Sequence, residues 1–333
     1  MRLIDVSNWA EDRSNSPYPE GARDKVAYIS PENLNDKEVL SNHRFLLKFS
    51  NDRYPGQFWA EVVAAKVAEL MGVPCPPTFL ALHPESGRPG SLVSWFYGES
   101  LEANDLPPTP KLNELVASDS LPTPKAPTES SLYVSGGSYM TRMIEGYDLK
   151  KGTQHNLRSL AVLLTHFRRT FGLDFWPHWA GVLAFDALIG NTDRHQDNWG
   201  VLWRAWESRY TVPRFSPAFD NGTSLMHEIH DAKIKNFQDK AQLAAYIARG
   251  THHLRFKIDD PKRAGHIELL KTLVETRPYL KVFVESVFDI NLEPLRGKLE
   301  ILKAMDIPTP LSDERADLMF RSLEVRLENI RTE

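Results

Sequence analysis

One segment of the chain is so uniformly apolar that a helix formed by it would have no polar side to face water. It spans residues 177–190, "PHWAGVLAFDALIG", in which nearly every position is apolar. A helix that is apolar all round is buried in the core of a large domain. The segment therefore predicts a helix at the centre of a lobe, with other elements packed around it.

The residues that follow this segment are polar almost without interruption. They join it to the strand-like run "WGVLW" at 199–203. A turn at such a place needs Gly, Ser and Pro more than charged side chains. The density of donors and acceptors favours a functional site, although a polar turn in which Asp193 caps and Arg194 forms a salt bridge is the alternative. The side chains in question are those of Asn191, Asp193, Arg194, His195, Asp197 and Asn198.

A second segment, "FSPAFDNGTSL" at 215–225, repeats this pattern. Asp220 ends an apolar and aromatic run, and Asn221-Gly222 predicts a sharp turn directly after it; an Asx-turn without function is the alternative. Phosphoryl transfer from a nucleotide uses one Asp to accept the proton of the acceptor hydroxyl, and an Asn and a second Asp to hold magnesium. Magnesium prefers oxygen ligands. The two segments together supply such a set.

The N-terminal part of the chain predicts strands with one inserted helix. The runs "KVAYIS", "RFLLKFS", "TFLALH" and "SLVSWFY" are typical of strands, and "GQFWAEVVAAKVAELMG" is typical of a helix that ends at Gly72. Lys48 is the single charge among Phe45, Leu46, Leu47 and Phe49. A lysine on an apolar strand rarely stays unpaired, so we expect it to bind a phosphate and a carboxylate, although its ammonium could instead reach water.

Local composition and hydrophobic periodicity divide the rest of the chain into two lobes. Leu101–Ser131 is rich in Pro, Ser and Thr and predicts a flexible connection. Beyond Tyr147 the pattern is mainly helical, and Ser312 is a candidate N-cap for the last helix. The segment "NLRSLAVLLTHFRRTFG" predicts a helix with one apolar face, formed by Leu157, Leu160, Leu164, Phe167 and Phe171. We predict an α+β, bilobal architecture, with a small mixed N-terminal lobe at 1–100, a connection at 101–146 and a larger, mostly helical C-terminal lobe at 147–333.

Several of these segments resemble a known family. "FDALIGNTDRHQDNWGVL" and "SPAFDNGTSL" look like the C-terminal kinase domain of HipA-like serine/threonine kinases. "FLLKFS", "FWAEVVAAKVAELMGVPCPP" and "SLVSWFYGES" are similar to the N-terminal kinase lobe of that family. The resemblance covers roughly Val26 to Leu225 and is weak at 101–147. It implies a protein-kinase-like fold, ATP with Mg²⁺, and transfer of phosphate to Ser or Thr of a protein substrate.

The resemblance also implies roles for individual residues. Asp193 would be the catalytic base, and Asn198 and Asp220 would hold Mg²⁺. Lys48 would contact the phosphates of ATP, with Glu61 on the following helix as its partner. The residues expected beside the rest of the nucleotide are Ser94, Trp95 and Phe96 as the hinge next to adenine, and His195, which we expect to form hydrogen bonds within its loop.

Other features of the sequence depart from the family or leave alternatives open. No clear Gly-rich phosphate loop is present; the best candidate is Glu20–Ser30, with Gly21 at its turn. This candidate lies close to the start of the chain, so we do not expect the extra N-terminal domain of HipA toxins. A toxin role with a small antitoxin-like regulator therefore stays open.

Competing functions follow from the same motifs. A similar "DRH…N" pattern occurs in phosphoinositide kinases, so a lipid or small-molecule kinase is an alternative. A pseudokinase that serves as a binding module is another, although Lys48, Asp193, Asn198 and Asp220 are all present. The "GNTD" segment is also similar to part of the metallophosphoesterase motif, but Thr192 stands where that motif needs a histidine.

Composition limits the partners, the metal sites and the cellular compartment that we expect for the protein. The net charge of -4 gives no basic field, so we expect no direct binding of nucleic acid. Cys75 is the single cysteine, which excludes an internal disulfide and multi-cysteine metal sites, and fits a reducing cytoplasm. No apolar run approaches the ~20 residues of a membrane span, and the first residues lack a signal-peptide pattern.

Overall fold

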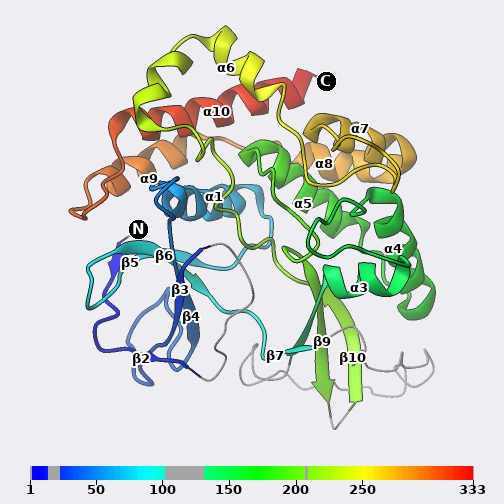
Figure 1. Ribbon diagram of the computed structural model, residues 1–333, viewed down its shortest axis with the longest axis horizontal. Helices are drawn as coiled ribbons and strands as arrows, with labels where there is room; N and C mark the ends of the chain where they lie inside the picture. The colour runs from blue at the N-terminus through cyan, green and yellow to red at the C-terminus, as the bar shows by residue number, and fades with distance from the viewer. Residues whose placement is uncertain (1, 14–22, 102–130, 207–208, 333) are drawn as a thin grey trace.

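The computed structural model has a mixed N-terminal lobe and a larger, mostly helical C-terminal lobe (Figure 1). It describes residues 2–13, 23–101, 131–206 and 209–332. The predicted bilobal α+β architecture is confirmed. The connection predicted at Leu101–Ser131 and the candidate turn at Gly21 lie almost wholly outside the described residues.

The N-terminal lobe is built on a six-stranded sheet of order β1-β5-β6-β4-β3-β2. Its strands are β1 (Leu3–Ile4), β2 (Ala10–Glu11), β3 (Lys25–Ile29), β4 (Arg44–Phe49), β5 (Thr78–Leu82) and β6 (Pro89–Ser94). The pairing is antiparallel except between β1 and β5. Side chains alternate along β4, so Phe45, Leu47 and Phe49 pack into one core cluster while Leu46 joins another. Lys48 shares the face of Leu46.

Helix α1 (Gln57–Met71) crosses between the two lobes. It contacts β4, β5 and β6 on one side and α5 and α9 on the other. Because both sides are covered, almost all of its residues are buried, including the charged Glu61. The helix ends at Gly72, which has the left-handed φ of 66° that glycine adopts at low cost. This end was predicted from the sequence.

A second sheet, of order β10-β9-β8-β7, links the lobes. It consists of β7 (Glu99–Leu101), β8 (Ser131–Ser135), β9 (Gly200–Trp206) and β10 (Arg209–Phe215). Strand β8 pairs with β9 along its whole length and runs into α3 (Gly136–Met143). The last part of the connection predicted at 101–146 is therefore regular structure. The reason is that "SLYVS" pairs with β9, which begins at Gly200.

The C-terminal lobe surrounds α5 (Trp176–Ile189), which is buried along nearly its entire length. Helices α7, α8 and α10 contact it, and α1 reaches it from the other lobe. The predicted central helix is confirmed. The other helical elements of this lobe are α4 (Leu157–Phe171), η2 (Asp231–Phe237), α6 (Lys240–Ile247), α7 (His266–Thr276), η3 (Pro278–Leu280), α8 (Lys281–Val287), α9 (Glu293–Lys303) and α10 (Asp313–Thr332).

Two local predictions in this lobe also hold. Leu157, Leu160, Leu164, Phe167 and Phe171 form the buried face of α4. The hydroxyl of Ser312 accepts a hydrogen bond from the backbone N–H of Arg315 at 3.2 Å, as expected of an N-cap.

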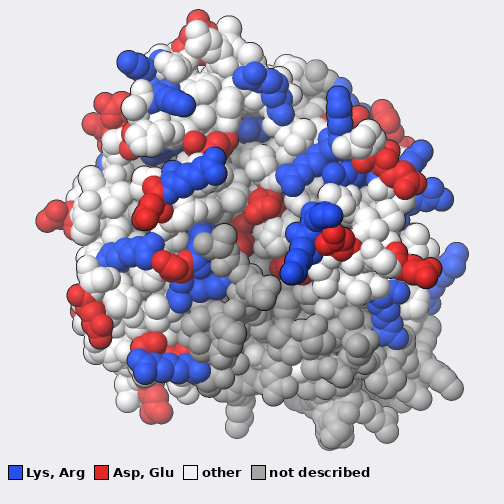
Figure 2. Space-filling model, in the orientation of Figure 1, with Lys and Arg blue, Asp and Glu red and all other residues white. Residues whose placement is uncertain are grey.

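The face of the molecule seen in Figure 1 carries separated charges. Acidic side chains lie near its centre, with Lys and Arg side chains on either side of them (Figure 2). Among the described residues, no helix is long and apolar enough to cross a membrane.

Candidate functional site

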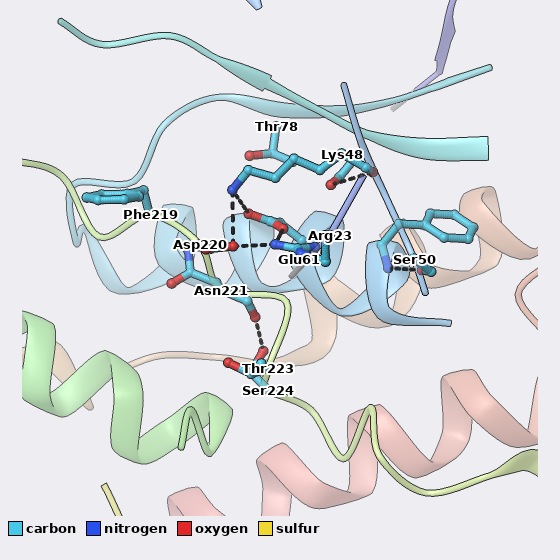
Figure 3. A network of polar contacts seen from close by, with 12 residues as sticks. Arg23, Lys48, Ser50, Glu61, Thr78, Phe219, Asp220, Asn221, Thr223 and Ser224 are labelled. Carbon is cyan, nitrogen blue, oxygen red and sulfur yellow. Dashed lines mark hydrogen bonds and ion pairs between the residues drawn. The ribbon is translucent and has the colours of Figure 1, made fainter. Parts of the chain in front are cut away.

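Four charged side chains meet between the lobes, and we call them the interlobe network (Figure 3). Lys48 comes from β4 and Glu61 from α1, and their Nζ and Oε1 atoms are 3.2 Å apart. Lys48 Nζ also lies 3.1 Å from Oδ1 of Asp220, which the C-terminal lobe contributes. The fourth member, Arg23, donates to Glu61 Oε2 at 2.6 Å and also to Asp220 Oδ1. The predicted pair of Lys48 and Glu61 is present, and Asp220 joins it.

The sequence did not predict a role for Arg23, although this residue lies within Glu20–Ser30, the candidate for a phosphate loop. It lies just before β3, and its side chain is 10% exposed. Burial lowers the pKa of the guanidinium, but Glu61 and Asp220 outweigh this and raise the pKa above its ordinary value. Its Nη1 is buried and has no acceptor among the described residues. A Cβ on Gly222 would lie 2.7 Å from this atom, so the absence of a side chain there makes room for the guanidinium.

Asp220 sits at a strained point of the backbone. Its φ of 56° lies in the left-handed region, which Asp and Asn tolerate better than most residues and which occurs often at functional sites. Burial raises the pKa of its carboxyl, but Lys48 and Arg23 together hold the pKa far below its usual range. The side chain is nevertheless 36% exposed. An ionised carboxylate is thus presented to the space between the lobes.

The loop after α5 is ordered by hydrogen bonds that its polar side chains form with its own backbone and with Thr223. Oδ1 of Asn191 accepts from the backbone N–H of Asp193 at 3.0 Å and from the hydroxyl of Thr223 at 3.1 Å. The side-chain amide of Asn198 donates to the backbone carbonyl of Asp193 at 2.6 Å. Burial raises the pKa of Asp193 above its ordinary value, and the charge of Asp220 adds to this. These contacts fix both ends of the segment around Asp193.

Arg194 ties the two predicted segments together, in what we call the C-lobe network. Its guanidinium binds both carboxylate oxygens of Asp186 on α5, at 3.0 and 2.7 Å. It also donates to Oδ1 of Asn221 at 2.6 Å and to the backbone carbonyl of Phe219. His252 completes the network, with Nε2 3.1 Å from Asp186 Oδ2. The salt bridge that the sequence left as an alternative for Arg194 exists, and it holds the Asp193 loop against the Asp220 segment.

Asp186 was also missed, although one signal was available. It is the single carboxylate in an otherwise apolar helix, and its side chain is fully buried. Burial raises the pKa of the carboxyl, but the adjacent Arg194 and His252 outweigh it and lower the pKa far below the usual range. A buried charge of this kind requires a partner, which in this case is Arg194.

His195 forms hydrogen bonds within its loop, as expected. Its backbone N–H donates to the carbonyl of Asp193 at 2.7 Å, and its Nδ1 accepts from the backbone N–H of Asp197 at 3.2 Å. Burial lowers the pKa of the imidazole, but Asp197 and Asp193 raise it above its ordinary value. The ring therefore supports the conformation around Asp193.

The predicted hinge begins at Ser94, the last residue of β6, and reaches the Asp220 segment through aromatic contacts. The hydroxyl of Ser94 lies 2.9 Å from Nε2 of His43. Trp95 is buried, and its backbone N–H donates to the carbonyl of Arg44 at 3.0 Å. The ring of Phe96 lies 5.1 Å from that of Phe219, the residue before Asp220. The hinge and the interlobe network are thus neighbours.

The donor set fits a magnesium ion that also binds phosphate. Asp220 supplies a carboxylate, and Asn198 supplies an amide whose nitrogen is already engaged with Asp193. Within the described ranges, no three His, Cys, Asp or Glu side chains gather into a possible metal site. Magnesium commonly binds through one or two protein ligands and completes its shell with water and substrate phosphates. The buried donor of Arg23 and the ammonium of Lys48 suit those phosphates.

Comparisons with known proteins identify the fold. No protein-family model matches the chain, and no curated protein matches it in sequence. The proinflammatory kinase CtkA of Helicobacter pylori is similar in structure, with a TM-score of 0.69 and 17% identity over 99% of this chain and 95% of that one. HipA of Shewanella oneidensis, in a complex with HipB and operator DNA, has a TM-score of 0.50 and 13% identity over 94% of this chain and 66% of that one. The chain therefore has the fold of these kinases, and the predicted resemblance to HipA-like kinases is confirmed at the level of the fold.

Proposed function

We propose that the protein transfers the γ-phosphate of ATP to a Ser or Thr hydroxyl of a protein, with magnesium as cofactor. The observation that carries the proposal is the interlobe network. A buried lysine and glutamate from the N-terminal lobe meet an ionised Asp220 from the C-terminal lobe. This is the arrangement that positions phosphates in protein kinases. The fold shared with CtkA and HipA supports the same chemistry.

Asp193 has the role of base in this proposal. Its loop is held by Asn191, Asn198 and Arg194, so its carboxylate can accept the proton of an acceptor hydroxyl from a fixed position. The raised pKa that burial gives Asp193 makes it a stronger base than an exposed aspartate. Proton acceptance and the orientation of the acceptor are its two tasks.

The remaining residues bind the nucleotide. Lys48 and Arg23 are the cations for the phosphates, and Glu61 keeps both in place. Asn198 and Asp220 would hold Mg²⁺, which neutralises charge on the phosphates when it is bound. Ser94, Trp95 and Phe96 would border the adenine.

A small regulatory protein is a further part of the proposal. HipA was solved with HipB, and the fold shared with HipA supports a partner of that kind for this chain. Copurification of tagged protein from its own host, followed by mass spectrometry, tests for such a partner.

Transfer of label from γ-labelled ATP tests the proposed activity. Wild-type protein with Mg²⁺ should label a protein on Ser or Thr, itself or a component of host lysate, as phosphosite mapping would identify. Asp193→Asn should bind nucleotide and transfer nothing above background. Label that appears on lipid or on a small molecule instead would assign the acceptor to one of the alternatives. Label without dependence on Asp193 would refute the proposed base.

A further inference from the structure

Next to the Asp193 loop lies a second segment, residues 249–265, which we call the basic loop. It connects α6 with α7, and a bridge between Thr251 and Gly265 closes it. The backbone N–H of His252 donates to the carbonyl of Ala264, and that of Ala264 donates to Leu254, both at 2.9 Å. Leu254 is fully buried. The loop is therefore anchored to the lobe core.

The charge of this loop is opposite to that of the whole chain. Arg249, Arg255, Lys257, Lys262 and Arg263 outnumber Asp259 and Asp260, so the loop carries 5 − 2 = 3 positive charges, whereas the chain carries -4. Lys257, Lys262 and Arg263 are exposed. None of the five cations forms an ion pair within the part of the chain that the structure describes. In Figure 2, Lys and Arg side chains border the central acidic region on the side where the segment between α6 and α7 crosses this face.

Arg263 places one of these positive charges near Asp193, the proposed base. Its Nη1 donates to the backbone carbonyl of Thr192 at 3.2 Å, one residue before Asp193. The charges of Arg263 and Asp193 are close enough to influence each other's ionisation. No other acceptor binds this guanidinium among the described residues, so most of its donors remain available. An acceptor hydroxyl that approaches Asp193 comes near these donors.

The proposed nucleotide site has cations of its own, apart from Arg263. Lys48 and Arg23 already place two positive charges at the interlobe network, and both come from the N-terminal lobe. Arg263 lies on the C-terminal lobe, against the backbone of the Asp193 loop. A guanidinium with free donors matches a carboxylate in two-point geometry, which an exposed lysine does not.

We propose that the basic loop selects the acceptor, and that it fits a protein segment with Asp or Glu beside the target Ser or Thr. Arg263 is the main specificity-determining residue, and Lys257 and Lys262 add a general attraction for acidic proteins. This inference rests on the proposed protein kinase activity and extends it to the class of acceptor.

Two synthetic peptides that differ only in charge test the inference. One places Asp and Glu on both sides of a single Ser, and the other replaces them with Asn and Gln. Wild-type protein should have the lower KM for the acidic peptide. Arg263→Gln should raise the KM for the acidic peptide roughly tenfold to a hundredfold, the range expected for a hydrogen bond to a charged group, and leave the neutral peptide unchanged. The matched control is Arg169→Gln, which changes an exposed arginine at the end of α4.

Charge reversal provides a second readout that loss of folding cannot imitate. Arg263→Glu should prefer a peptide with Lys on both sides of the Ser, while its KM for ATP stays at the wild-type value. Equal KM values of wild-type protein for the acidic and neutral peptides would overturn the inference and leave the kinase proposal standing. A raised KM for ATP in Arg263→Gln, with peptide KM unchanged, would overturn it in favour of a nucleotide contact. Wild-type protein that phosphorylates no peptide or protein at all refutes the kinase proposal itself, and the inference with it.

Discussion

The interlobe network and the C-lobe network use the same kinds of residue but differ in how completely their hydrogen bonds are satisfied. In the interlobe network, Lys48 and Arg23 share one oxygen of Asp220. Asp220 is 36% exposed, and Nη1 of Arg23 is buried without an acceptor among the described residues. A buried donor without an acceptor costs about 1–3 kcal/mol. Within the part of the chain that the structure describes, this network is therefore incomplete.

The C-lobe network is complete. Both oxygens of Asp186 are bound, and all three guanidinium nitrogens of Arg194 donate. Nε and Nη2 bind Asp186, Nη2 also binds Asn221, and Nη1 binds the backbone carbonyls of Asn198 and Phe219. Asp186 and Arg194 are fully buried. Neither of these two side chains can reach a ligand between the lobes, so the pair serves to position the segments that do. The difference separates residues that act on a substrate from residues that hold them in place.

The largest effects should come from the two aspartates that face the space between the lobes. Asp193→Asn should keep magnesium-dependent nucleotide binding and reduce turnover about 10²- to 10⁴-fold, because it removes a positioned base. Asp220→Asn should lose turnover together with the magnesium dependence of nucleotide binding, because it removes a charged ligand. Calorimetric titration with ATP, with and without Mg²⁺, distinguishes the two variants. The opposite pattern would show that the roles are exchanged.

Variants of the C-lobe network should lose stability instead. Asp186→Asn leaves the charge of Arg194 buried without its carboxylate, and the free energy of unfolding should fall by about 3–5 kcal/mol. Urea denaturation measures this loss. The control is Glu328→Gln, which breaks the exposed pair with Lys240 and should cost less than ~1 kcal/mol. A similar small cost for Asp186→Asn would mean that the two networks do not differ as argued.

The pH dependence of stability sharpens the same comparison. The folded protein holds the pKa of Asp186 below its ordinary value, so the stabilisation is fully present above the unfolded pKa of about 3.9. It is lost as the pH falls toward the folded pKa. Asp186→Asn has no such proton to bind, so its stability should decline less steeply than that of wild-type protein below about pH 4. Parallel acid limbs in the two proteins would contradict the assignment.

The sequence predicted one network better than the other for a physical reason. A lysine inside an apolar strand and a helical glutamate after it are local signals, so the pair of Lys48 and Glu61 could be predicted. Strand and helix periods likewise predicted β3 to β6, α1, α4 and α5. Arg23 is separated from Asp220 by 197 residues, and only the fold brings them together. The pair of Asp186 and Arg194 was not predicted, because Arg194 lies eight residues further along the chain, in the loop after α5, where no helical period connects the two.

Lys48→Met should weaken catalysis and leave the fold intact. The ammonium is buried between two carboxylates that Arg23 can still neutralise, so a stable protein is expected. Loss of a charged contact with the phosphates should lower kcat/KM for ATP roughly tenfold to a hundredfold. Glu61→Gln should show a milder form of the same defect. Wild-type phosphorylation by Lys48→Met, with an unchanged melting temperature, would remove Lys48 from the site.

The smallest of these effects is expected for Arg23, which tests whether the incomplete network is completed by phosphate. Its guanidinium already binds Glu61 and Asp220, so a phosphate gains only the contact with Nη1, which has no acceptor among the residues that the structure describes. Arg23→Gln should therefore raise the Kd for ATP about twofold to tenfold, which corresponds to the ~0.5–1.5 kcal/mol of a single hydrogen bond. Arg88→Gln is the matched control, because it breaks the exposed pair with Asp24 in the same lobe. An unchanged Kd for ATP with a lower requirement for Mg²⁺ would mean that Arg23 competes with the metal for Asp220 instead.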